Sequence, residues 1–250
     1  GYWYWMNRRL RKKNEELAVA RDKAQESSRM KSAFIKNISH EIRTPLNILS
    51  GFTQIISQTD VEQPLEIRVE ASRNIQENTN RITSLVNRLL DLSELSSRNS
   101  IDRSDSISAN RLCQEAIQNS GIAEKPDHAF SFVSTVDDGV MLQTSVHYAT
   151  LAIVHLIDNA EKFTPEGGRI TMKCDVKEQM LCVTVEDTGC GIPEGKAETI
   201  FDEFVQLDEY KDGVGIGLTL SRNTVRYLGG DIVLDATYDK GARFFVLLPL

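Results

Sequence analysis

A histidine followed directly by a glutamate is the first pair of side chains in this sequence that could do chemistry. Glu41 could orient the imidazole of His40, or take the proton from its Nδ1 atom, and so leave Nε2 as a nucleophile. Thr44 lies one helical turn further on, on the same face as His40. Pro45 lacks the amide that would bond the carbonyl of Glu41, which loosens the helix there. A lone surface histidine usually has no catalytic role. The hypothesis that His40 is a nucleophile therefore rests on these neighbouring residues.

Three glycines before a predicted helix could hold a phosphate group. Gly213, Gly215 and Gly217 lead into Leu218 and a helical pattern that runs to about Tyr227. Because glycine has no side chain, its backbone amide can come close to an anion at the start of a helix. The pattern lacks the preceding strand of a dinucleotide site and the lysine of a P-loop. A flexible lid or an ordinary helix start is the alternative.

Five further residues could complete a nucleotide site. Asp187, at the end of a predicted strand, could accept a hydrogen bond from an adenine amino group, and Gly189 and Gly191 would leave room for the base. Asn159 offers an amide oxygen, which is a hard ligand suited to Mg²⁺, and Lys162 could meet a phosphate. Taken singly, each has a structural alternative, either a tight turn or a surface side chain.

Two helical segments must position His40. The composition from about residue 14 to residue 57 favours one long helix, and a second follows a break at residues 58–64. Apolar residues alternately three and four apart mark one packed stripe on each, which predicts an antiparallel hairpin with His40 on the opposite, solvent-facing side. One hairpin buries little surface, so we expect a homodimer that forms a four-helix bundle. The stripes are Ile35, Ile38, Ile42, Pro45, Leu49, Phe52 and Ile56, then Ile75, Asn78, Ile82, Leu85, Leu89 and Leu92.

The second half of the chain differs from the first in composition and in its predicted secondary structure. A polar stretch at residues 96–108 predicts a linker, and residues 109–250 mix helical runs, such as 151–163, with short alternating strands. The expected strands include residues 169–176, 181–186 and 243–248. This pattern predicts an α/β layer domain with mostly antiparallel strands.

Composition excludes several classes of protein. At 250 residues with 40% hydrophobic residues, the chain is long enough for two ordinary domains. A net charge of −7 and a pI near 5.2 leave no broad basic surface for nucleic acid. The four cysteines form no CxxC pair, so neither a zinc site nor a disulfide framework is indicated.

The start of the chain is typical of a membrane exit. Aromatic residues 2–5 run into a basic cluster at residues 8–13, which fits the cytoplasmic end of a transmembrane helix. No apolar run is itself long enough to span a bilayer, so we expect a segment of a longer protein that starts just inside its last transmembrane helix. The alternative is an exposed aromatic cluster. Everything after Lys13 is expected to be cytoplasmic.

The segment FIKNISHEIRTPLN at residues 34–47 resembles the H-box of sensor histidine kinases. Residues 155–163, 187–191, 201–204 and 213–217 then resemble the N-box, G1-box, F-box and G2-box of the same family, in the family's order. The resemblance covers the chain from about Asn14. It implies a dimeric all-α helical hairpin, followed by an α/β two-layer sandwich of the histidine kinase, gyrase and chaperone ATPase type. The implied boundaries are a membrane-exit segment at 1–13, a signalling helix at 14–30, a phosphoacceptor domain at 31–97, a linker at 98–108 and an ATP-binding domain at 109–250.

The resemblance also implies roles for the residues above. His40 would accept the γ-phosphoryl group of ATP with help from Glu41, and Thr44 would position water when the same protein dephosphorylates its partner. Asn159 would bind Mg²⁺, and Lys162 would offset phosphate charge. That partner is a response regulator, whose aspartate receives the phosphoryl group, and the whole protein would be a bacterial inner-membrane sensor.

Two departures and two rival functions accompany the resemblance. The N-box commonly begins with Asn where this chain has His155, which could still bond near the γ-phosphate, and Ala242-Arg243 replaces the usual Gly-Thr. An ATP hydrolase of the gyrase or chaperone kind should carry a glutamate where His155 stands, and it lacks the helical hairpin. The other rival is a degenerate kinase that acts as a dimeric scaffold, or as a phosphatase through Thr44.

Overall fold

The chain divides into two units. The structure, a computed structural model, describes residues 2–57, 64–97, 100–202 and 217–250. One unit contains the described residues up to Thr83, and the other begins at Ser84. Each unit is described by itself.

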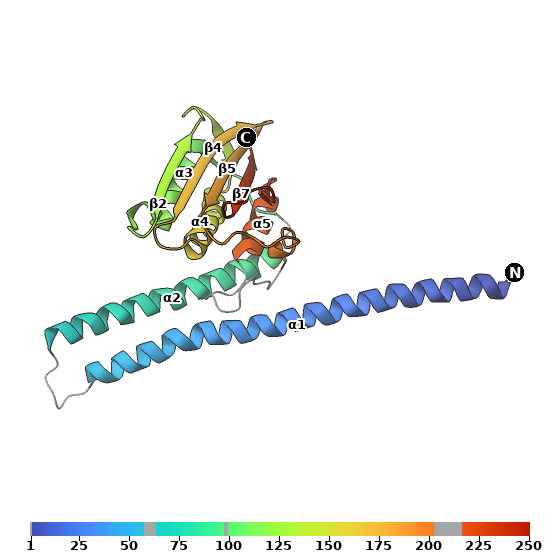
Figure 1. The fold of residues 1–250 in the computed structure, drawn as a ribbon, viewed down its shortest axis with the longest axis horizontal. Helices are drawn as coiled ribbons and strands as arrows, with labels where there is room; N and C mark the ends of the chain where they lie inside the picture. Colours follow the sequence, from blue (N-terminus) through green and yellow to red (C-terminus); the bar gives the residue numbers. More distant parts are fainter. Residues whose placement is uncertain (1, 58–63, 98–99, 203–216) are drawn as a thin grey trace. The chain divides into compact units, whose positions relative to one another are not determined.

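The first unit is helical, as predicted. Helix α1 (Tyr2–Ser57) is continuous for 56 residues, and α2 (Leu65–Ser97) returns after it (Figure 1). Pro45 lies inside α1 without ending it. The helix also runs back through the segment expected to be a membrane exit. The turn was predicted at residues 58–64, of which residues 58–63 lie outside the described residues.

The predicted stripes are only partly covered within one chain. Pro45 and Asn78 are buried, whereas Ile35 and Ile56 remain 56% and 46% exposed. Other exposed apolar residues on the two helices of this unit include Leu46, Ile48, Ile55, Leu65, Ile67 and Val69. An apolar surface of this extent is typical of a site of association.

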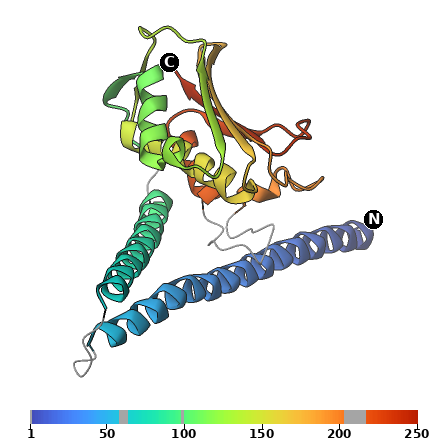
Figure 2. The same cartoon turned by 60° about the vertical axis from the view of Figure 1, so that its left-hand side comes forward.

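The second unit is an α/β sandwich, which confirms the predicted fold class. Its main sheet has the order β2-β4-β5-β7-β6, in which β2 and β4 run parallel and the other neighbours are antiparallel. Helices α3, α4 and α5 pack against the sheet (Figures 1 and 2). The strands are β2 (Ala129–Ser134), β4 (Arg169–Lys177), β5 (Met180–Asp187), β6 (Asp231–Leu234) and β7 (Arg243–Pro249), and the helices are α3 (Ala109–Ser120), α4 (Val146–Phe163) and α5 (Gly217–Tyr227).

The core of this unit lies between the sheet and the helices. Burial alternates along β7, where Phe244, Val246 and Leu248 are buried and their neighbours are only partly covered. Such alternation is expected of a strand with one face against helices. The sheet thereby gives β5 a rigid setting, and the end of β5 carries Asp187.

The structure differs from the sequence prediction in the expected linker. Strand β1 (Asp105–Ser108) falls within residues 98–108 and pairs antiparallel with β3 (Met141–Thr144). Ile101 and Ile107 are buried. A polar, serine-rich stretch can still form a strand when a distant partner supplies the hydrogen bonds, which local composition does not reveal. The regular structure of the α/β unit therefore begins before residue 109.

A substitution at Gly230 tests the packing before β6. A Cβ atom on Gly230 would lie 1.7 Å from the carbonyl oxygen of Leu247, a backbone atom of β7. We expect Gly230→Ala to lower the free energy of unfolding by about 2 kcal/mol, measured by urea denaturation. In Gly139→Ala the added Cβ meets nothing within 4 Å, so a change below about 0.5 kcal/mol is expected. Equal losses in both variants would contradict the packing argument.

Candidate functional site

His40 is exposed on α1, as its place opposite the apolar stripe predicted. The hydroxyl of Thr44 donates a hydrogen bond to the carbonyl oxygen of His40 at 3.2 Å. Glu41 is partly buried, and its Oε2 atom accepts a hydrogen bond from Nη2 of Arg81 on α2 at 3.1 Å. This charged pair fastens the two helices together beside the histidine. It also fixes a carboxylate next to His40 in the chain.

Asp187 is the anchor of the second group of residues. It is 5% exposed at the end of β5, and its Oδ1 atom accepts hydrogen bonds from the amides of Gly189 and Ala242 at 2.8 and 3.1 Å. Burial raises the pKa of Asp187 from its usual value, although these two bonds oppose the shift. Within the described part of the chain, Oδ2 has no hydrogen bond. The second oxygen is thus available to accept a bond from a ligand.

The departure at Ala242 has a structural explanation. The amide of Asp187 donates to the carbonyl oxygen of Ala242 at 2.9 Å, and the amide of Ala242 bonds the Asp187 side chain in return. Both bonds need only the backbone of Ala242, so an alanine can hold the aspartate here.

The glycines of the G1 region are required by contacts between backbones. A Cβ atom on Gly189 would lie 2.4 Å from the carbonyl oxygen of Phe163, at the end of α4, and Gly191 has a φ of +69°. Gly217, at the start of α5 beside the half-buried Leu218, differs because no atom of the described residues lies within 4 Å of its added Cβ. The predicted residues Gly213 and Gly215 lie outside the described residues.

Helix α4 carries the remaining predicted residues. Asn159 is partly buried and Lys162 is exposed, with its Nζ atom 5.1 Å from the centre of the Phe163 ring. The adjacent Asp158 accepts a hydrogen bond from Arg88 of α2 at 3.2 Å. The structure thus gathers the predicted residues of α4 and β5 in one unit, whereas His40 belongs to the other.

His155 is buried on the side of α4 that contacts α5. Its Nδ1 atom lies 3.1 Å from Oγ of Ser221, whose hydroxyl donates to the carbonyl oxygen of Gly217 at 2.7 Å. Its Nε2 atom is buried and has no hydrogen-bond partner among the described residues. Burial, followed by the charge of Arg88, lowers the pKa of His155 to about 3. The imidazole is therefore neutral near pH 7. Sequence reasoning missed both Ser221 and Arg88, because nothing local marks either as a neighbour of His155.

Acid should destabilise the second unit through His155. The pKa of a histidine in the unfolded chain, 6.5, exceeds the folded value of about 3, so the unfolded chain binds a proton first as the pH falls below about 6.5. Stability that is full above this pH is lost progressively toward about pH 3, by about 1 kcal/mol between pH 7.5 and 5.5. We expect His155→Asn to lose about 1 kcal/mol less than the parent over this interval in urea unfolding. Identical losses would show that another group is responsible.

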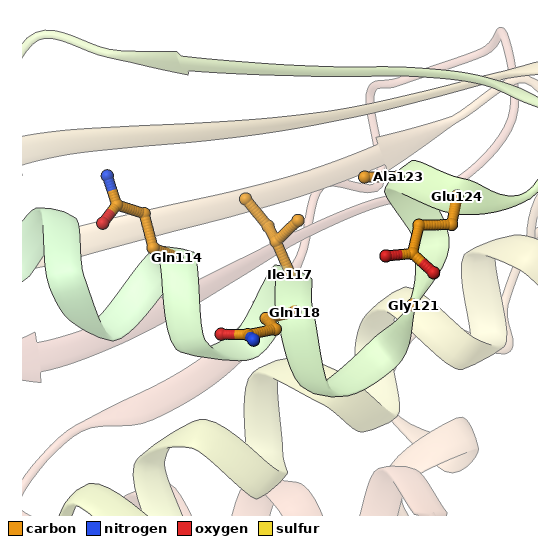
Figure 3. A pocket seen from close by; sticks show the side chains of 6 residues that line it. All are labelled: Gln114, Ile117, Gln118, Gly121, Ala123 and Glu124. Atoms are coloured by element: carbon orange, nitrogen blue, oxygen red, sulfur yellow. The ribbon is translucent and has the colours of Figure 1, made fainter.

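No metal site stands ready within the described residues. They contain no group of three or more His, Cys, Asp or Glu side chains that could hold a metal ion. A separate hollow of about 270 Å³ lies along α3 and is lined by none of the predicted site residues (Figure 3). Its lining residues are Gln114, Ile117, Gln118, Gly121, Ala123 and Glu124.

Two family models match the chain at the parts described above. Residues 30–98 match the His Kinase A (phospho-acceptor) domain. Residues 146–250 match the histidine kinase-, DNA gyrase B- and HSP90-like ATPase. The two matches lie in the order that the H-box and N-box resemblances predicted.

Curated proteins and a solved structure show the same likeness. The chain is 30% identical over 249 residues to Sensor protein GacS of Pseudomonas syringae pv. syringae, covering 95% of this chain and 27% of that protein. It is 30% identical over 222 residues to sensor histidine kinase WalK of Bacillus subtilis (strain 168), covering 86% and 36%. The chain thus spans well under half the length of these relatives. The structure of histidine kinase ThkA in complex with response regulator protein TrrA superposes with a TM-score of 0.63 at 22% identity, covering 86% of this chain and 60% of that chain.

Proposed function

We infer that this chain, which belongs to the sensor histidine kinases of two-component systems, transfers the γ-phosphoryl group of ATP to His40 and then to an aspartate of a response regulator. One observation carries the proposal. A phospho-acceptor helix that exposes His40 and an ATPase sandwich with a hydrogen-bonded Asp187 occur together in a single chain. The chain therefore contains both the histidine that would accept the phosphoryl group and the domain that would bind ATP, its donor.

The acceptor side needs a nucleophile and a neighbouring base. In the proposed step, Glu41, which Arg81 holds in an ion pair, assists removal of the Nδ1 proton of His40. A bond then forms between Nε2 and the γ-phosphorus while the bond to the bridging oxygen breaks and ADP leaves. Such chemistry depends chiefly on positioning and electrostatics. Solvent exposure of His40 supports this role, because an enclosed imidazole could not meet a nucleotide carried by another domain.

The nucleotide side needs residues for the base and for the phosphates. The second oxygen of Asp187 would accept a hydrogen bond from the adenine amino group. Lys162 and the amides of Gly213, Gly215 and Gly217 would offset phosphate charge. The position of Gly217 at the start of α5 supports this assignment, because no atom of the described residues lies within 4 Å of a Cβ added there.

We propose that Mg²⁺ accompanies ATP at Asn159. The amide oxygen of this residue is a hard ligand, and Mg²⁺ commonly binds through few protein ligands together with phosphates and waters. The support for this assignment is the type of side chain and its place, because Asn159 lies partly buried on α4, one turn after His155. When bound, the ion would supply positive charge against the phosphates.

An ATP hydrolase of the gyrase or chaperone kind fits the residues less well. Such an enzyme would need a base one turn before Asn159 to activate water, and His155 stands there. With a pKa lowered to about 3, its imidazole is too weak a base to take a proton from water efficiently near pH 7. Transfer to the protein is therefore favoured over hydrolysis.

Dephosphorylation of the response regulator is a second proposed activity of the same helix. Thr44 is exposed one turn after His40, and its hydroxyl proton is bonded to the His40 carbonyl. Its oxygen is thus left to accept a bond from a water molecule. The degenerate-kinase alternative, a scaffold or phosphatase without kinase activity, receives no support from Asp187, whose hydrogen bonds are intact.

Dimerisation and membrane attachment complete the proposal. The exposed apolar residues of α1 and α2 support a homodimer that forms a four-helix bundle. No described helix has the length and apolar character needed to cross a membrane. Trp3, Tyr4 and Trp5 are exposed ahead of the basic cluster, which supports an attachment through a preceding transmembrane helix. The described region would then be the cytoplasmic portion of a bacterial inner-membrane protein.

The chemistry of the product tests the proposal. The purified chain is incubated with Mg²⁺ and γ-labelled ATP, and the protein-bound label is treated with acid or alkali. A phosphohistidine should be labile to acid and stable to alkali. Release of free phosphate with no label on the protein would favour the hydrolase instead.

A further inference from the structure

We propose that Ser221 is a positioning residue that fixes the imidazole of His155 in the form protonated at Nδ1, so that Nε2 can only accept a hydrogen bond. Ser221 lies one turn into α5, outside every motif on which the proposed function rests. The part of this inference that concerns the rate of phosphorylation rests on the proposed function. The part that concerns the proton does not.

The hydrogen bonds of Ser221 decide where the proton lies. A serine hydroxyl carries a single proton, and here it is donated to the carbonyl oxygen of Gly217 at 2.7 Å. Toward His155 the hydroxyl therefore offers only lone pairs. Because Nδ1 of His155 lies 3.1 Å from that oxygen, Nδ1 must be the donor. The partner of one ring nitrogen thus sets the state of the other.

Burial limits the other hydrogen-bond partners that Ser221 and His155 could find. Ser221 is 1% exposed and His155 is 4% exposed, so water has little access to offer either side chain another partner. A neutral imidazole carries one proton, and with that proton on Nδ1 the Nε2 atom is a bare acceptor. Nε2 is enclosed without a partner among the described residues. An enclosed acceptor without a donor is unfavourable, so a ligand that brings a donor is favoured there.

The chemistry of the missing donor follows from the state of Nε2. Phosphate oxygens are acceptors and cannot bond a bare Nε2, so under this assignment His155 does not bond the γ-phosphate directly. A water molecule can donate, and the waters around a metal-bound nucleotide are nearby candidates because Asn159 lies one turn along the same helix. We therefore assign as the partner of His155 a water that would enter together with the bound nucleotide, because bulk water has little access to this side chain without it.

The proton can be located directly by nuclear magnetic resonance. The full 250-residue chain is labelled with ¹⁵N-histidine, and both ring nitrogens of each histidine are observed without nucleotide near pH 7. His155→Asn identifies the signals. We expect a protonated Nδ1 and an unprotonated Nε2 in the parent and in Ser221→Thr, which keeps the hydroxyl. Ser221→Ala should move the proton, in part or fully, to Nε2. Thr224→Ala, a buried truncation on the same helix, should leave it in place.

Activity provides the second readout. Removing one hydrogen bond that orients His155 should lower the rate of His40 labelling at saturating ATP about three- to tenfold in Ser221→Ala, with ATP affinity nearly unchanged and with recovery in Ser221→Thr. A parent protonated at Nε2, or a Ser221→Ala variant that still carries the proton on Nδ1, overturns the inference. If the parent shows the expected proton but neither the parent nor any variant is phosphorylated, the proposed kinase function fails while the assignment of Ser221 stands.

Discussion

A His40→Gln variant is expected to carry no acid-labile phosphate after incubation with Mg²⁺ and γ-labelled ATP, under conditions that label the parent. Glutamine is a good helix former and keeps a polar side chain, but its amide nitrogen has no lone pair for attack on phosphorus. The ion pair of Glu41 with Arg81 does not involve His40, so the hairpin should stay folded. We expect the label to fall to background, a loss of about a hundredfold or more.

The matched control is a second exposed histidine. His147 lies near the start of α4, and His147→Gln should be labelled like the parent. Label of equal amount on His40→Gln would mean that another residue is the acceptor. If neither the parent nor the variants are labelled although ATP binds, the kinase proposal is wrong. The hypothesis of a degenerate kinase that acts as a scaffold or phosphatase then takes its place.

An Asp187→Asn variant is expected to bind ATP about 10- to 100-fold more weakly. The amide oxygen of asparagine can still accept the bonds from Gly189 and Ala242, so the backbone around the site should hold. The other oxygen is replaced by an amino group, however, which would face the amino group of adenine as a second donor. The loss is measured by calorimetric titration with ATP in the presence of Mg²⁺.

The neighbouring carboxylate supplies the control for this prediction. Glu186 forms ion pairs with Lys173 at 2.9 Å and with Arg243 at 2.8 Å, and its side chain leaves the strand on the opposite face. Glu186→Gln should change the ATP affinity by less than about twofold while lowering stability slightly. Equal losses of affinity in both variants would indicate a general effect of charge on this strand, and Asp187 would lose its assigned role.

Regular elements were predictable because their patterns are local. The apolar stripes of α1 and α2 and the alternation along β4, β5 and β7 repeat with the period of the structure that forms. The strand β1 was not predicted, because three of its four residues are polar and the strand depends on pairing with β3. Likewise α4 begins at Val146, five residues before the expected start, where the apolar period is less clear.

Site residues that lie on one element were also predictable from spacing. His40 and Thr44 are one turn apart on α1, and His155 and Asn159 are one turn apart on α4, so their common faces follow from the helical period alone. The state of His155 was not predictable. Its neutral form depends on burial and on Arg88, which is 67 positions away in the sequence.

By itself, the sequence determined the chemistry that is available and the elements that carry it: an exposed histidine on one helix, and an amide, an aspartate and glycines on an α/β unit. The tertiary structure alone decided which groups meet. Asp187 contacts Ala242 across 55 residues because β5 pairs with β7, and His155 contacts Ser221 across 66 residues because α4 packs on α5. A local pattern is set by the backbone period within a few residues, whereas such contacts depend on the order of strands and the packing of helices, which no short stretch of sequence contains.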